Sequence, residues 1–212
     1  PAVLTYSVTP TTPDGCTGDP FTVSVTVNPL GQVDNPGDQE FCNNDNISIN
    51  FSTDNTGGDT TYSWTNTNSA IGLSNSGSGN INITATNTTN DAITSTVTVI
   101  PSFEGCEGTP QTFTITVNPE PSIDNIEQEV CTGSGISITP TDGTIPVGTT
   151  YSWDAPTSSP SGVITGGNSG TDETTITESE LLNSTNSPAV LTYSVTPTTP
   201  DGCTGDPFTV SV

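Results

Sequence analysis

Residues 1–25 of this chain, PAVLTYSVTPTTPDGCTGDPFTVSV, return without a single change at residues 188–212. A second, weaker repeat lies inside that period, since Val27-Asn28-Pro29 returns as Val117-Asn118-Pro119. Self-similarity at a fixed spacing is the signature of a chain built from units of one kind, each unit stacking on its neighbours. The long period is therefore expected to hold two related units.

Three short motifs occur in the same order in both units: Gln-Glu-x-Cys, then Thr-Tyr-Ser-Trp, then Gly-Cys-x-Gly. Each full unit thus carries an early and a late cysteine. We expect the last part of a truncated domain over residues 1–29 and a full domain over residues 30–118. A second domain that lacks only its last few residues is expected over 119–212. Cys16 is then the late cysteine of the truncated domain, and the polypeptide is expected to continue upstream.

Short runs in which apolar and polar residues alternate predict an all-β chain. Alternation is clear in Leu4–Val8, Phe21–Val27, Ile47–Phe51, Phe113–Val117 and Ile136–Ile138. Such runs bury one face of an antiparallel sheet and leave the other in water. About seven short strands in each unit, separated by Gly, Pro, Asn and Asp, favour tandem immunoglobulin-like β-sandwiches. Short, Pro-rich linkers predict that these domains form an elongated rod.

The charge composition excludes most kinds of chemistry. The chain has 23 Asp and Glu residues and no Lys, Arg or His, which gives a net charge of −23. Without His or Lys there is no Ser-His or Cys-His pair and no Schiff-base lysine. Nucleic-acid binding relies on Lys and Arg, so it is not expected, and neither is contact with an anionic membrane. We predict that the chain is not an enzyme and has no catalytic residues.

Five cysteines without a Cys-x-x-Cys pair favour disulfides in an oxidising, extracellular setting. In an up-and-down sandwich, we expect the early and late cysteines to lie at the same, N-terminal pole. This predicts one disulfide in each domain, Cys42 with Cys106 and Cys131 with Cys203. Trp64 and Trp153 follow the early cysteines at the same spacing and are predicted to fill the two cores.

The Thr-Tyr-Ser-Trp strand, the Gly-Cys-x-Gly hairpin and the closing Phe-Thr-Val-x-Val-Thr-Val-Asn-Pro strand resemble PKD-like and immunoglobulin-like repeats of very large bacterial surface adhesins. Such proteins occur in gliding bacteria and are exported by the type IX system. The resemblance implies a long filament or stalk at the cell surface or outside the cell, and it supplies no catalytic residues. Neighbouring repeats of the same chain or fibre are then the expected partners.

Carboxylates gather in the sequence at the two linkers and in the late hairpins, which suggests a metal. Calcium takes six to eight oxygen ligands, and this chain offers carboxylates without a cation to relieve their repulsion. The alternative is that these residues form solvated turns. The predicted calcium ligands are Asp34, Asp38, Glu104, Glu107, Asp124, Glu127, Glu129, Asp201 and Asp206.

Two functions remain open at this stage. The first is a structural repeat of an extracellular filament or adhesin stalk, stabilised by calcium at its domain junctions. The second is an adhesive module that binds surface glycans, other cells or a protein through the loops at one pole. No membrane insertion is expected, because no apolar run is long enough to span a bilayer.

Overall fold

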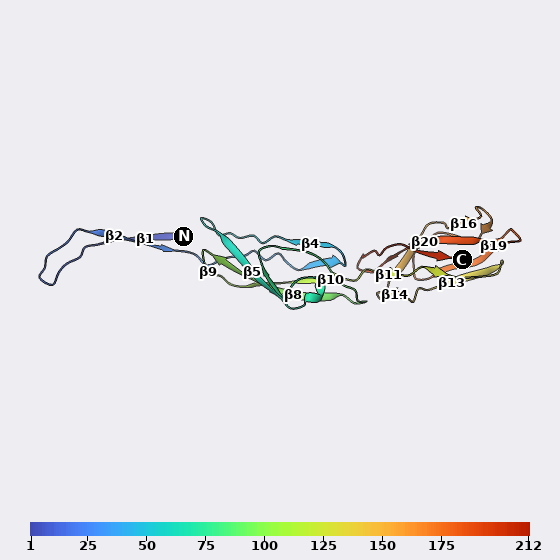
Figure 1. Ribbon diagram of the computed structural model, residues 1–212, viewed down its shortest axis with the longest axis horizontal. Coiled ribbons are helices and arrows are strands. Elements are labelled where there is room, and N and C mark those ends of the chain that lie inside the picture. The colour runs from blue at the N-terminus through green and yellow to red at the C-terminus, as the bar shows by residue number, and fades with distance from the viewer.

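The computed structural model describes residues 1–212 as an elongated rod of three parts, with the N-terminal strands at one end and the second β-sandwich at the other (Figure 1). The parts are an N-terminal hairpin, a first sandwich and a second sandwich. Every regular element is a strand except one short 3₁₀ helix, η1 (Ser69–Ile71). The prediction of all-β tandem sandwiches is therefore confirmed. No helix is long and apolar enough to cross a membrane.

The first sandwich packs a six-strand sheet against a pair of strands. The sheet order is β3-β10-β8-β5-β6, with β9 paired to β8, and β4 pairs with β7 on the other layer. The first and last strands of the sandwich, β3 and β10, run parallel, whereas the other pairs are antiparallel. Its strands are β3 (Gln39–Cys42), β4 (Asn46–Ile49), β5 (Thr60–Asn66), β6 (Ser76–Ser78), β7 (Ile81–Thr84), β8 (Ile93–Phe103), β9 (Cys106–Glu107) and β10 (Gln111–Asn118).

The second sandwich repeats this plan. Its larger sheet has the order β12-β21-β20-β15-β18, with β12 parallel to β21, and β13-β19-β17 forms the other layer. Its strands are β11 (Ser122–Ile123), β12 (Ile126–Glu127), β13 (Ser134–Ile138), β14 (Gly143–Thr144), β15 (Thr150–Trp153), β16 (Thr157–Ser159), β17 (Ile164–Thr165), β18 (Gly170–Glu173), β19 (Ile176–Asn183), β20 (Val190–Thr198) and β21 (Phe208–Ser211).

Each sandwich has its own core, and a tryptophan contributes to each. Trp64 and Trp153 are buried, as predicted, within two separate clusters of apolar side chains. Each indole N–H donates to a backbone carbonyl fifteen residues later, at 3.1 Å and 2.9 Å. A glycine of the neighbouring strand faces each ring, because a Cβ at Gly77 or Gly170 would lie only 2.5 Å from the Cη2 atom of the indole. These glycines make room for the tryptophans.

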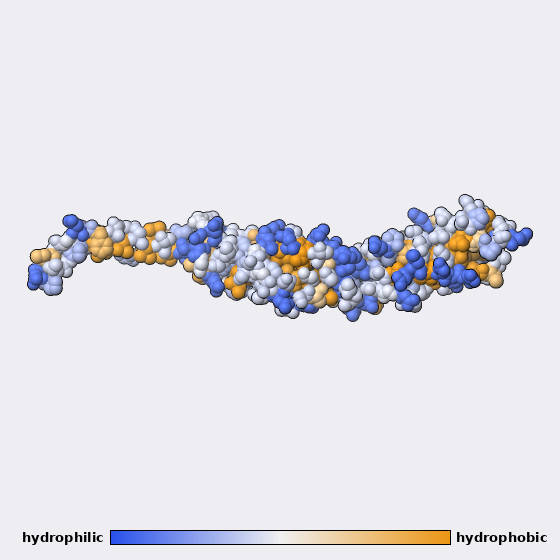
Figure 2. Space-filling view, in the orientation of Figure 1, coloured by the Kyte–Doolittle hydropathy of each residue, from blue (hydrophilic) through white to orange (hydrophobic).

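The N-terminal hairpin consists of β1 (Ala2–Val8) and β2 (Phe21–Val27), paired antiparallel along their whole length. It stands away from both sandwiches, and all of its strand residues are exposed. The space-filling view shows its apolar side chains as orange patches on the surface (Figure 2). This hairpin is therefore a paired ribbon without a second layer.

Candidate functional site at the junction of the sandwiches

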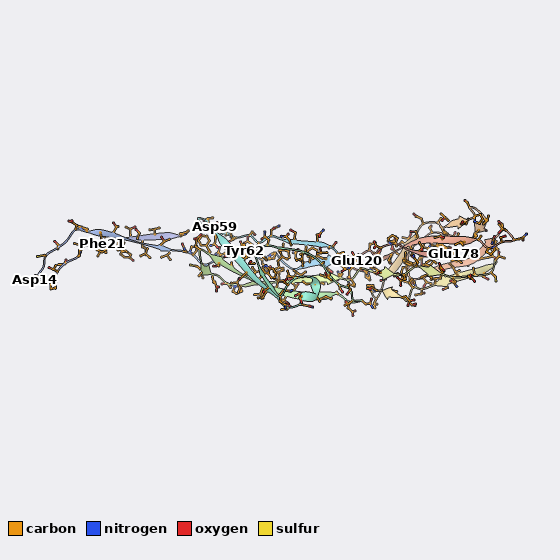
Figure 3. All side chains as sticks on the ribbon, viewed as in Figure 1. Asp14, Phe21, Asp59, Tyr62, Glu120 and Glu178 are labelled. Carbon is orange, nitrogen blue, oxygen red and sulfur yellow. A yellow bond between two sulfur atoms is a disulfide. The ribbon has the colours of Figure 1, made fainter.

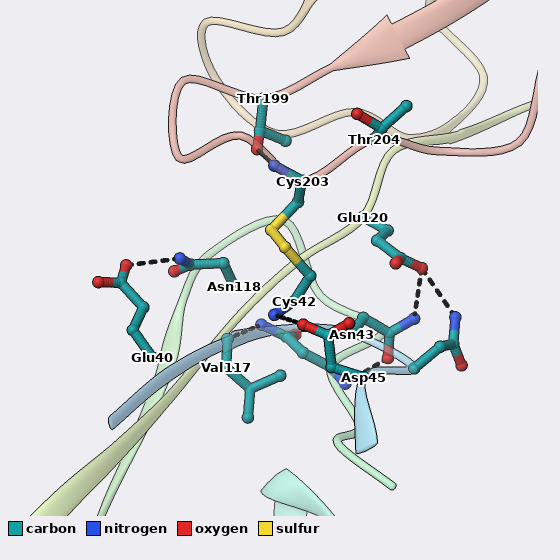
Figure 4. The surroundings of a disulfide bond; sticks show 12 residues. Glu40, Cys42, Asn43, Asp45, Val117, Asn118, Glu120, Thr199, Cys203 and Thr204 are labelled. Carbon is teal, nitrogen blue, oxygen red and sulfur yellow. Dashed lines mark hydrogen bonds between the residues drawn. A yellow bond between two sulfur atoms is a disulfide. The ribbon is translucent and has the colours of Figure 1, made fainter. Parts of the chain in front are cut away.

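A disulfide joins the two sandwiches. Cys42 of the first sandwich is bonded to Cys203 of the second, with 5.5 Å between their Cα atoms (Figure 4). Cys16, Cys106 and Cys131 are free. The predicted pairing of Cys42 with Cys106 and of Cys131 with Cys203 is therefore wrong. The one disulfide of the structure lies between domains, not within each.

The direction of β3 explains the correction. Because β3 runs parallel to β10, Cys42 lies opposite Asn118, at the end where the first sandwich finishes. Cys106 precedes the start of β10, which is eight residues long and spans roughly 27 Å. The two cysteines thus lie at opposite poles of the sandwich. Cys203 occupies the near pole of the second sandwich, beside Cys42.

Short-range hydrogen bonds fix both cysteines. The N–H of Cys42 donates to Oδ2 of Asp45 at 2.8 Å, which closes the turn after β3. The N–H of Cys203 donates to Oγ1 of Thr199 at 3.1 Å, and the N–H of Thr199 donates back to the carbonyl of Cys203 at 2.9 Å. Cys203 is completely buried. Each cysteine is therefore held in a structured turn rather than on a free loop.

A carboxylate in the linker forms a second connection. Glu120 accepts hydrogen bonds from the side-chain amides of Asn44 at 2.8 Å and Asn43 at 3.4 Å, both in the turn after Cys42 (Figure 4). Asn44 has a φ of 66°, a conformation that Asn tolerates better than most residues. Figure 3 shows Glu120 between the two sandwiches. Charge-assisted bonds of this kind tie the linker to the first sandwich.

A third connection runs directly between loops of the two sandwiches. The N–H of Ile145 donates to Oδ1 of Asn90 at 2.9 Å. The Asn90 loop is itself fixed by Asn87, whose Nδ2 donates to the carbonyls of Asp91 and Val117 at 2.8 and 2.7 Å. The junction is thus joined by one covalent bond, by the hydrogen bonds of Glu120 and by the hydrogen bond of Asn90. Such an arrangement restricts bending between the sandwiches.

The linker itself passes close beneath the late hairpin. A Cβ on Gly205 would collide with the carbonyl oxygen of Pro121, so only glycine leaves room for the linker there. Next to this crossing lies a polar hollow of about 380 Å³, lined by residues of both sandwiches including Asn43, Glu120 and Asp206. The junction is therefore close-packed backbone with a small polar hollow beside it.

Three of the predicted calcium ligands make hydrogen bonds within the first sandwich. Oδ2 of Asp34 accepts from the hydroxyl of Ser52 at 2.6 Å, and Oε1 of Glu104 accepts from the N–H of Asp59 at 2.8 Å. Oδ1 of Asp38 accepts from the N–H of Thr114 at 2.7 Å, which lowers the pKa of the Asp38 carboxyl. These carboxylates stabilise their own loops and strands.

The other six predicted ligands are distributed along the rod. Glu107 lies in β9 and Glu127 in β12, while Asp124 and Glu129 flank β12 and Asp201 lies in a turn; Asp206 alone lines the junction hollow. The structure forms no group of three or more His, Cys, Asp or Glu side chains that could hold a metal ion. Calcium binding at the junctions stays a prediction.

Sequence reasoning did not select the residues that form the junction's hydrogen bonds, namely Asn43, Asn44, Asn90 and Glu120. One signal was available for Asn90. The loop that holds it, beginning at Asn87, returns at Asn183, and both asparagines accept from the N–H two residues later at 2.9 Å. Two loops with the same hydrogen bond, at the same end of each sandwich, indicate the same function in both.

A buried carboxylate in the second sandwich is fully partnered. Glu178, labelled in Figure 3, accepts from the N–H of Asn168 at 2.7 Å and from the hydroxyl of Tyr193 at 3.2 Å. Burial and the Glu178 carboxylate together raise the pKa of Tyr193. This polar pair lies in the core of the second sandwich.

Solved structures that match this chain do so at low identity and with low TM-scores. The FN1–FN3 domains of chicken CNTN1 have a TM-score of 0.37 and 12% identity, covering 99% of this chain and 74% of that one. The SGBP-B protein of the Bacteroides ovatus mixed-linkage glucan utilization locus, solved with a heptasaccharide, has a TM-score of 0.30 and 16% identity, covering 86% and 48%. The fibronectin(III)-like modules of Clostridium thermocellum CbhA have a TM-score of 0.29 and 13% identity, covering 86% and 92%.

The comparison with curated proteins found no match. A family profile, in contrast, covers nearly all of the sequence. The profile described as PKD-like domain matches three consecutive segments, residues 1–31, 39–121 and 128–212. The three matches correspond to the hairpin and the two sandwiches, in that order. The chain belongs to the PKD-like domain family.

Proposed function

We propose that this chain is a non-catalytic spacer of an extracellular filament or adhesin stalk, which holds its two ends apart at a fixed distance. The observation that supports this role is the junction. A disulfide between Cys42 and Cys203, together with the contacts of Glu120 and Asn90, joins two sandwiches end to end. A spacer needs a connection that resists bending and extension, and three separate links support such a connection here.

The same bond supports a location outside the cytosol. Disulfides persist in oxidising compartments and are rare in the cytosol. Attachment to a bacterial surface, export by the type IX system and membership of a long adhesin remain part of the proposal and rest on the resemblance of the repeats. An adhesive role, in which the loops at one pole bind a glycan or a protein, stays the alternative, and a glycan array probed with the chain would reveal it.

The test of the spacer role is single-molecule pulling from the two ends of the chain. With the disulfide closed, force passes from Cys42 directly to Cys203 and bypasses the residues between them. The sequence separation of 161 residues then keeps roughly 550 Å of chain from extending. We expect the oxidised chain to extend only outside the disulfide loop, through residues 1–42 and 203–212, and to keep the enclosed length from extending. Reduction should release that length.

Two variants make the pulling result specific. Cys42→Ser should release the hidden length without a reductant, whereas Cys16→Ser, which changes an exposed free cysteine, should leave the trace unchanged. If the oxidised chain extends as far as Cys42→Ser under the same force, the junction does not carry load and the spacer role is wrong.

A further inference from the structure

The observed disulfide follows a rule that the repeat defines. The early cysteine of one sandwich, Cys42, bonds to the late cysteine of the next, Cys203. The two free cysteines of the sandwiches lie at the same positions of the repeat, but each in the other sandwich. Cys106 is the late cysteine of the first sandwich, and Cys131 is the early cysteine of the second. Under the same rule each of them has a defined type of partner.

Cys106 lies at the pole where the chain enters the first sandwich. Its carbonyl accepts from the N–H of Gly31 in the incoming linker at 3.0 Å. A Cβ on Gly108 would collide with the carbonyl of Gly31, just as one on Gly205 would collide with Pro121 at the observed junction. The linker therefore crosses beneath the Cys106 hairpin as it does beneath the Cys203 hairpin. Cys106 faces the side from which a preceding sandwich arrives.

Cys131 lies in a turn of the same form as the turn of Cys42. The carbonyl of Cys131 accepts from the N–H of Ser134 at 3.0 Å, and that of Cys42 accepts from the N–H of Asp45 at 3.2 Å. Gly133 has a φ of 86° where Asn44 has 66°, so both turns use a left-handed residue at the same place. Cys131 is exposed at the far pole of the second sandwich. Its turn therefore has the same backbone form as the turn that holds Cys42.

The surroundings of Cys131 also repeat the docking surface of the first sandwich. Asn186 occupies the place of Asn90, in a loop whose Asn183 donates to the carbonyl of Ser187 at 2.8 Å as Asn87 donates to Asp91. A pole with this turn and this asparagine can receive another sandwich.

The residues that form the polar contact of the observed junction are replaced at the equivalent positions of the repeat, both in the linker and in the turn. Leu30 stands in the first linker where Glu120 stands in the second, and Thr132 and Gly133 stand where Asn43 and Asn44 stand. Both the acceptor and its amide donors are absent together. Leu30 is 63% exposed in this chain. The matched change fits an apolar contact of Leu30 in place of the polar contact of Glu120.

We propose that Cys131 of one unit and Cys106 of the unit that follows form a second type of disulfide between sandwiches. Each sandwich is then covalently joined to its neighbours at both poles. The partner is a further repeat of this same chain, because residues 1–25 repeat residues 188–212 and the N-terminal hairpin has the sequence of β20 and β21. The inference requires tandem repeats and an oxidising compartment, but not a load-bearing role.

The bond forms by thiol–disulfide exchange with a protein oxidant that carries a reactive disulfide. The thiolate of one cysteine attacks that disulfide and forms a mixed disulfide, and the thiolate of the other then displaces the oxidant as a dithiol. Two S–H bonds are lost and one S–S bond forms. The two electrons and two protons pass to the oxidant.

The test uses an extended chain in which residues 119–187 precede residue 1. Because residue 188 begins the same sequence as residue 1, the join is seamless and completes the N-terminal hairpin as a sandwich. In this chain the original Cys131 is changed to Ser, so that the added copy of Cys131 gives a unique peptide. Digestion with glutamyl endopeptidase without reductant, followed by mass spectrometry, identifies the partners.

We expect one cross-linked peptide pair that joins the added Cys131 to Cys106, a second that joins Cys42 to Cys203, and one free thiol at Cys16. A bond between the added Cys131 and Cys16 would be a bond within one sandwich and would overturn the proposal. So would a free thiol at Cys106 in the folded, oxidised chain. The control Cys106→Ser should leave the added Cys131 free and raise the count to two thiols.

The same sample separates this inference from the proposed function. If the peptide pair is found but pulling still extends the sandwiches, the disulfides exist without a spacer role. If the pair is absent while Cys42 and Cys203 still resist extension, the spacer role stands and the proposed second disulfide is wrong.

Discussion

Tyr6 and Tyr193 occupy the same position in two identical stretches of sequence, yet Tyr6 is 52% exposed whereas Tyr193 is completely buried. In the second sandwich β12 and β15 flank the hairpin of β20 and β21 within one sheet, and the strands of the other layer pack on its face. The N-terminal hairpin has no such layer. The same residues therefore form a core in one place and an apolar surface in the other.

This contrast predicts that the N-terminal hairpin will gain a core when residues 119–187 are joined in front of residue 1. Amide hydrogens of Val3 and Tyr6 should exchange quickly in the present chain, because an isolated two-strand ribbon is marginal in water. In the extended chain they should be protected as strongly as those of β20. Exchange measured by NMR tests this, with the amides of β20 as the internal standard. Unchanged, rapid exchange would mean that the added residues do not pack on the hairpin.

Opening the disulfide should weaken the pair of sandwiches as a unit. In the chain-entropy picture a cross-link between residues 161 apart stabilises by about 5 kcal/mol. We expect Cys203→Ser to lower the total free energy of unfolding by up to that amount and to separate the calorimetric transitions of the two sandwiches. Cys16→Ser is the matched control. Identical melting curves for both variants and the parent chain would contradict this prediction.

Gly77→Ala should destabilise the first sandwich. The new methyl group would press on the Trp64 ring, and overpacking of this kind costs about 1–3 kcal/mol. Urea unfolding followed by tryptophan fluorescence measures the change, and Gly170→Ala should act in the same way on Trp153. Ser78→Ala, on the same strand but exposed, is the control. Equal stability of Gly77→Ala and Ser78→Ala would show that the ring has room to move.

The second sandwich should lose stability in alkaline solution. Burial and the Glu178 carboxylate raise the pKa of Tyr193 above the usual value of 10.0. As the pH rises past about 10, the unfolded chain therefore ionises this phenol first, and stability falls until the folded-state pKa is passed. Below pH 10 the contribution is fully present. We expect Tyr193→Phe to flatten the decline between pH 9 and 11.

The measurement is urea unfolding at several pH values from 8 to 11. Tyr151→Phe offers a comparison, because burial alone raises the pKa of Tyr151. It should flatten the decline as well, though without any dependence on Glu178. A decline of the same slope in the parent chain and in Tyr193→Phe would show that other groups cause the alkaline loss.

Calcium at the junctions remains to be tested directly. Melting the chain with calcium and with a chelator, and measuring its length by small-angle scattering, decides the question. If calcium binds at the junctions, both the midpoint and the stiffness should rise with the ion. If neither changes, the carboxylates of Asp34, Asp38 and Glu104 serve only the hydrogen bonds described above.

The alternating runs predicted the fold well because the side-chain period of a strand is visible in the sequence itself. Trp64 could likewise be assigned to a core from its place in the third strand. The partner of Cys42 could not be found in this way. It depends on the pole at which the first strand ends, and that pole is set by the parallel pairing of β3 with β10. Sequence spacing shows that two cysteines belong to one unit but not which end of the unit each occupies.

The carboxylates show a different limit. Asp38, in a linker, and Glu104, in a late hairpin, are predicted metal ligands because both regions are rich in carboxylates in the sequence. In the structure each accepts a nearby backbone N–H, of Thr114 and of Asp59. Such bonds compete with any ligand for the same oxygen atoms, and a charge pattern alone does not reveal them.

The bond between Cys42 and Cys203 also requires that the first sandwich folds before its cysteines are oxidised. Cys106 leaves the ribosome long before Cys203, so a chain oxidised while still unfolded would favour the nearer partner. Once the first sandwich has folded, β10 separates Cys42 from Cys106 by the length of the domain. The folded sandwich thus prevents the wrong bond until the next one is complete. Correct pairing is then selected by the timing of folding against oxidation, and a longer chain of such repeats would close its bonds one after another from its N-terminus.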